Sequence, residues 1–165
     1  LGIVCRRNDP LFRMRGRRRW SDLRGRTLLA NAISDGNEVD PAARFALITA
    51  RALGNAIHRP DVMRVALRLE AVQRALLVAG PLSYLRQDLV AGHSLGRFAD
   101  PPDDGTLDVI VGAILFAARR ILDGETGPDY RRSVITQLLR GLGLGPVEAA
   151  DLATRAVERD SDRVD

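Results

Sequence analysis

The sequence predicts an all-α protein, a helical bundle of about seven helices. Apolar residues recur at helical spacing, and no window alternates apolar and polar residues over the length of a strand. Gly, Pro and Asp stand between the apolar segments, where helices begin and end. With 165 residues, 45% of them hydrophobic, the chain is long enough to bury a core.

Proline and aspartate mark the helix starts, and glycine marks the ends. Asp40-Pro41 supplies an N-cap followed by a proline in the first turn. Gly80-Pro81 ends one segment and opens the next, and Asp123-Gly124 closes the most apolar one. The expected helices cover residues 21–34, 41–57, 61–79, 81–98, 106–122, 128–142 and 146 onward.

Positive charge is concentrated at the N-terminus. Residues 1–27 hold nine arginines and two aspartates, a net +7, whereas the remainder is net −3. Such a segment suits phosphate contact by counterion release, and a solvated leader is the alternative. We therefore expect a basic arm over 1–27 and a helical domain over 28–160. The candidate nucleic-acid contacts are Arg13, Arg15, Arg17, Arg18 and Arg19.

Cysteine content and hydropathy bear on the compartment. Cys5 is the single cysteine, so no intrachain disulfide is possible and a reducing compartment fits best. The longest apolar run, Val109 to Ala118, has ten residues, about half of what a membrane-spanning helix needs. No secretory signal pattern is present. We expect a cytoplasmic protein that does not bind a membrane.

Two segments near the C-terminus predict a dimer interface. Residues 106–122 (TLDVIVGAILFAARRIL) are apolar on almost every side, and residues 130–142 carry an apolar stripe with arginines opposite. We expect both to form a four-helix bundle with a second copy; a central core helix in a monomer is the alternative. The expected interface residues are Gly112, Ala113, Phe116, Ala117, Val134, Leu138 and Leu142.

Four segments share their order and spacing with a known regulator family. They are residues 46–69 (ALITARALGNAIHRPDVMRVALRL), 81–86 (PLSYLR), 108–122 (DVIVGAILFAARRIL) and 138–150 (LLRGLGLGPVEAA). Together they resemble the ligand-binding and dimerisation domain of TetR-family transcriptional regulators, most closely the actinobacterial γ-butyrolactone autoregulator receptors. The resemblance spans about residues 28–160. It implies a homodimeric repressor that senses a small hydrophobic molecule.

The resemblance also implies an effector pocket inside the helical body. Gln73 and Tyr84 offer the polar groups that such a pocket needs, and core packing is the alternative role of the apolar residues. The butyrolactone receptors carry a pocket tryptophan soon after the position of Tyr84, where this chain has Gln87 and Asp88. We therefore expect a different hydrophobic ligand. The expected lining residues are Phe45, Ile48, Leu69, Val72, Gln73, Leu76, Tyr84, Leu89 and Phe116.

The family also carries a helix-turn-helix before its effector domain. Residues 12–19 (FRMRGRRR) are only faintly similar to the end of that motif, because its His-Phe pair and lysine are missing. Without a recognition helix no element enters the major groove to read bases. We therefore expect DNA binding only where a helix-turn-helix lies upstream.

No pattern indicates catalysis or a cofactor. His58 and His93 fall in different expected helices, and the sequence has no HExxH, GxSxG or P-loop motif. An acidic segment at 34–40 lacks a calcium loop's final glutamate, since counting from Asp35 puts Ala46 at position twelve. We expect neither a metal nor an enzyme. Three hypotheses stay open: a TetR-type effector-binding regulator, a truncated relative acting through dimerisation alone, and a small helical enzyme.

Overall fold

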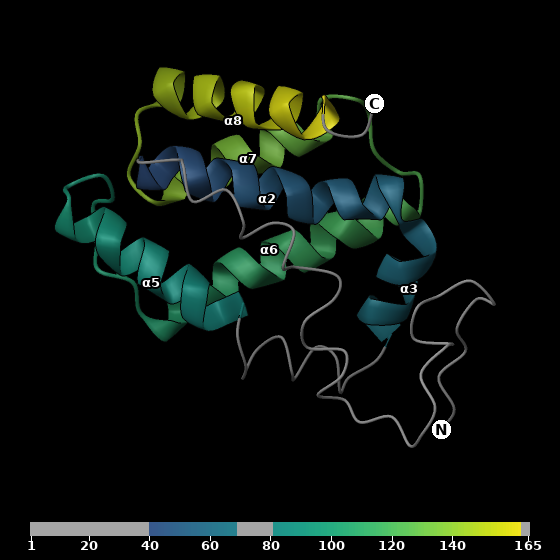
Figure 1. Cartoon of the computed structure of the whole chain (residues 1–165), viewed down its shortest axis with the longest axis horizontal. Coiled ribbons are helices and arrows are strands. Elements are labelled where there is room, and N and C mark those ends of the chain that lie inside the picture. Colours follow the sequence, from purple (N-terminus) through teal and green to yellow (C-terminus); the bar gives the residue numbers. More distant parts are fainter. Residues whose placement is uncertain (1–39, 69–80, 163–165) are drawn as a thin grey trace, which may run out of the picture.

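The computed structural model describes residues 40–68 and 81–162, without the side chains of residues 81–84 (Figure 1). Six helices and no strand occur in these two ranges, so the predicted all-α class is confirmed. The helix expected at 21–34 lies outside the described residues, as does the part of the expected 61–79 helix that follows Arg68. The described helices are α2 (Pro41–His58), α3 (Pro60–Arg68), α5 (Pro81–Ser94), α6 (Asp104–Leu122), α7 (Tyr130–Gly141) and α8 (Pro146–Ser161).

Helix α2 is the centre of the domain and contacts each of the other five described helices. Every fourth residue on one of its faces is small and buried, which lets neighbouring helices approach closely; these residues are Ala42, Ala46, Ala50 and Gly54. The helix starts as the sequence predicts. A side-chain oxygen of Asp40 accepts a hydrogen bond of 3.1 Å from the amide of Ala42, and Pro41 fills the first turn.

Helices α7 and α8 cover one side of α2 (Figure 1). Two contacts give the direction of α8 relative to α2. Arg97 joins Asp40, at the start of α2, to Glu148, at the start of α8. Near the far end of both helices, a Cβ added to Gly54 would meet the Asp160 carboxylate. Helices α2 and α8 are therefore parallel, and α7 returns antiparallel to α8 through a short turn.

Helix α6 lies on the other side of α2, with α5 near its first turn and α3 near its last (Figure 1). Arg86 of α5 pairs with Asp104 at the start of α6, and Arg64 of α3 reaches the carbonyl of Leu122 at the end, 3.5 Å away. The buried residues of α6 all face the core: Leu107, Ile110, Ala117 and Ala118. None of the described helices combines the length and apolarity needed to cross a membrane.

Helix α5 ends earlier than the sequence predicts. We expected a helix continuing to about Phe98, but it stops at Ser94. The reason is Gly96, which has a φ of +68° and donates its amide proton to the carbonyl of His93. A left-handed glycine just after the last turn reverses the chain and ends the helix.

Phe98 then folds back into the core instead of extending α5. Its ring meets that of Phe45 edge-on, with 6.4 Å between the centroids. The ring lies directly on Gly92, where an added Cβ would come within 2.2 Å of two ring carbons. Gly92 is therefore the position at which α5 makes room for Phe98.

Candidate functional site

One face of α6 points away from the core and exposes two large apolar side chains. Val109 is 68% exposed and Phe116 is 64% exposed, seven residues apart on the same side of the helix. Between them Gly112 is exposed, and no atom lies within 4 Å of a Cβ added there. Asp108 and Arg119 stand exposed at the two ends of the face. We call these five residues the α6 face.

The structure separates the residues that the sequence grouped as a dimer interface. Gly112 and Phe116 lie on the α6 face, and Ala113 is half-buried beside it. Ala117 points the other way and is 1% exposed. On α7 the expected stripe packs against α2 and α8 of the same chain, with Leu138 and Leu142 buried and Val134 partly buried against them. The dimer itself stays a prediction.

The residues expected to line a ligand pocket are likewise divided. Phe45 and Leu89 are buried in the hydrophobic core, and Ile48 is partly buried on α2. Phe116 lies on the α6 face, away from both. Leu69, Val72, Gln73 and Leu76 lie outside the described residues, as does the side chain of Tyr84. The pocket therefore stays a prediction.

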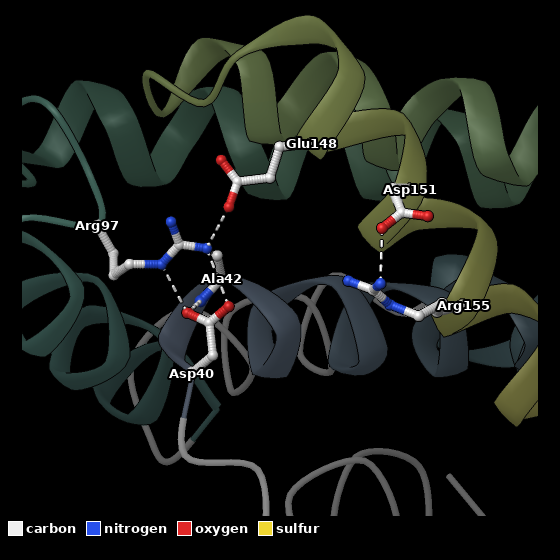
Figure 2. Close-up of polar contacts among 6 residues, drawn as sticks. All are labelled: Asp40, Ala42, Arg97, Glu148, Asp151 and Arg155. Atoms are coloured by element: carbon white, nitrogen blue, oxygen red, sulfur yellow. Dashed lines mark hydrogen bonds and ion pairs between the residues drawn. The ribbon is translucent and has the colours of Figure 1, made fainter.

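A three-way ion cluster ties the start of α2 to the start of α8 (Figure 2). The Arg97 guanidinium donates hydrogen bonds of 2.8 and 2.9 Å to the two oxygens of Asp40 and one of 2.8 Å to Glu148. These bonds hold the pKa of Asp40 below its usual value, although partial burial opposes the shift. They raise the pKa of Arg97. The cluster therefore holds the start of α2 next to the start of α8.

Two further ion pairs differ in how far the attraction between the charges offsets the cost of burying them. Arg131 of α7 pairs with Asp160 of α8, and both side chains are less than 10% exposed. Arg131 also donates to the carbonyl of Ala50 in α2 at 2.8 Å, so one guanidinium joins three helices. Arg44 and Asp88 pair at 2.6 Å between α2 and α5. There burial raises the pKa of Asp88 and outweighs the attraction of Arg44.

The histidines do not form part of a cluster. His58 is exposed at the end of α2, and Nδ1 of His93 lies 3.3 Å from the carbonyl of Phe98. Across residues 40–68 and 81–162, no three His, Cys, Asp or Glu side chains gather as metal ligands would. The candidate DNA contacts from Arg13 to Arg19 lie outside the described residues.

Sequence reasoning missed Arg97 and Phe98. Each acts through a partner more than forty residues away in the chain, so no local pattern marks them. Gly96 was the available signal, because it ends α5 and turns both side chains toward α2.

Comparison with known proteins gives no relative. No family model matches the chain, and neither a curated protein nor a solved structure matches it significantly. Over the residues that the structure describes, the chain is an all-α domain with a buried central helix and exposed apolar side chains on α6.

Proposed function

We propose that this chain is the dimerising, effector-sensing part of a cytoplasmic transcriptional regulator of the TetR type. The α6 face carries this proposal. It lies on the helix that the sequence resemblance assigns to dimerisation, and it exposes Val109 and Phe116 around an open glycine. A second copy would remove this apolar surface from water, at about 25 cal/mol for each Å² buried.

The effector part of the proposal rests on the sequence resemblance and on the helices that surround the core. The resemblance places the ligand among the helices expected at 41–57, 61–79 and 81–98, extending to 106–122. Three of the helices described there, α2, α5 and α6, all contact one another. Phe45 and Leu89 contribute apolar surface to that shared core. A small hydrophobic molecule that binds between these helices would stabilise the fold by mass action.

Light scattering on the purified chain tests dimerisation. We expect a mass of twice the 18.0 kDa of one chain, because the α6 face is buried in the pair. A mass of one chain at every concentration would exclude the homodimer.

Thermal-shift screening with lipophilic metabolites tests effector binding. A ligand at 100 times its Kd adds about 2.7 kcal/mol of stability and raises the melting temperature measurably. A dimer that no lipophilic compound stabilises would favour the relative that acts through dimerisation alone. Gel shifts with specific and random DNA duplexes, over a salt series, separate that relative from a regulator that reads DNA itself.

A further inference from the structure

We infer that two copies of this chain pair antiparallel across the α6 face alone, with Asp108 of each copy facing Arg119 of the other. The inference rests on the proposed homodimer, and it specifies the surface and register. It differs from the four-helix bundle that the sequence predicts, because α7 takes no part.

Helix α7 has no apolar face left for a second copy. Its apolar stripe is already used within the chain, where Ile135 and Leu139 are fully buried against the neighbouring helices. The residues that α7 leaves exposed are polar, among them Arg132, Gln137 and Arg140. To offer its stripe to a second copy, α7 would have to leave its own core.

The α6 face has a charged edge and an apolar edge. Asp108 and Arg119 are eleven residues apart, about three helical turns, so they lie on one edge of the face about 16 Å apart along the axis. Val109 and Phe116 are seven residues apart, about two turns, and lie on the opposite edge. Gly112 falls near the middle of the face.

The symmetry of the dimer decides which residues of the two α6 faces meet. In an antiparallel pair, a two-fold axis perpendicular to both helices keeps each edge facing the same edge of the other copy and reverses its direction. Asp108 then meets Arg119 of the second copy, and Val109 meets Phe116, with the two-fold axis close to Gly112. A parallel pair instead sets each residue level with its own equivalent, so like charges share each end. Charge complementarity therefore selects the antiparallel pair.

Gly112 allows the two helices to approach closely. No atom lies within 4 Å of a Cβ added to Gly112, so the single chain does not need a glycine there for packing. Its φ is not in the left-handed region either. A glycine in a helix interior is less stable than alanine by about 1 kcal/mol. In the pair, its missing side chain lets the two helices cross closely at the axis.

Charge reversal tests the register. We expect Asp108→Arg and Arg119→Asp each to weaken dimerisation about tenfold or more, because each sets like charges together twice in the homodimer. An equimolar mixture of the two variants should regain wild-type affinity, since a mixed pair restores opposite charges at both ends. Sedimentation equilibrium up to about 200 µM covers the weak affinity of a small interface. Asp100→Arg, on an exposed loop residue, is the charge-matched control.

The outcomes separate this inference from the function on which it rests. A wild-type chain that stays monomeric would overturn the proposed homodimer. A wild-type dimer unaffected by either reversal would overturn the α6 face and leave the homodimer standing. Weakened variants that do not recover on mixing would overturn the antiparallel register.

A steric variant gives an independent check. Gly112→Leu has free space in the single chain, so the monomer should fold normally by circular dichroism while dimerisation falls about tenfold or more. Gly141→Leu, at an equally open position of α7, should dimerise as the wild type does. Equal dimerisation of both variants would overturn the crossing at Gly112.

Discussion

Phe98 is buried where α5 turns toward α6, and its position depends on a glycine six residues earlier. The ring occupies the volume in which a side chain at Gly92 would lie, and its edge meets Phe45 of α2. The clash is with the stiff ring of Phe98, which core packing holds in place. The absence of a side chain at Gly92 therefore determines where the Phe98 ring packs.

We expect Gly92→Ala to destabilise the protein by about 1–3 kcal/mol, because the new methyl group overpacks the core and forces the Phe98 ring to shift. Urea unfolding measures the loss. Gly141→Ala is the matched control, because it is also helical but has open space. It should gain up to about 1 kcal/mol through helix propensity. Similar effects of both substitutions would contradict the packing argument.

At the scale of elements, two polar contacts set how α8 lies along α2. The Arg97 cluster joins the starts of both helices. Further along, Arg131 of α7 pairs with Asp160 in the last turn of α8 and donates to the Ala50 carbonyl of α2. The two differ in burial, since the Arg97 cluster is partly open to water while the second pair is almost completely enclosed. Their contributions to stability should therefore differ in size and in pH dependence.

We expect Asp160→Ala to cost about 3 kcal/mol or more, because it leaves the buried Arg131 guanidinium without an opposite charge, although the Ala50 carbonyl still accepts a hydrogen bond from it. Adding Arg131→Met should recover part of that loss, since no unpaired charge then stays inside. Chemical denaturation of both variants measures the difference. Arg155→Ala removes an exposed pair with Asp151, seen in Figure 2, and should change stability by no more than about 0.5 kcal/mol.

Asp40 should make stability depend on pH in the acidic range. Its pKa in the folded protein is lowered, chiefly by Arg97, below the unfolded value of about 4. The pair therefore stabilises the fold fully above about pH 5, and this contribution is lost as pH falls through the folded-state pKa. About a third of the side chain is exposed, so screening limits the effect to roughly 1 kcal/mol.

Asp40→Asn isolates this charge, because asparagine caps a helix as well as aspartate does. Urea midpoints between pH 3 and pH 7 should fall less steeply for the variant than for the wild type. Asp100→Asn, on an exposed loop residue, should keep the wild-type slope. Equal slopes for Asp40→Asn and the wild type would show that the cluster contributes nothing.

At the scale of the whole molecule, the exposed apolar surface of α6 predicts that stability depends on concentration. If unfolding also separates two copies, a tenfold rise in chain concentration should raise the melting temperature by about 2–4 °C. Phe116→Ser removes most of the apolar contact and should make the melting temperature independent of concentration. Calorimetry over a concentration series measures both. Val147→Ser, an exposed apolar residue on α8, is the control and should behave as the wild type.

The sequence determined the helical class and most of the described helix boundaries, because caps and breakers act within a few residues. Asp40-Pro41 opens α2, and Gly124, with a φ of +73°, follows the end of α6 as expected. The sequence pattern places the end of α5 near Phe98, whereas the helix stops at Ser94 because Gly96 reverses the chain.

Only the tertiary structure decided which apolar face meets which neighbour. A pattern gives the apolar side of a helix, but the choice between a core and a partner depends on where the other helices lie. The sequence pattern assigns residues of both α6 and α7 to one interface, yet α2 and α8 bury Leu138 while Phe116 stays exposed. For the same reason the central helix is α2, whose alanines admit close neighbours, and not the more apolar α6.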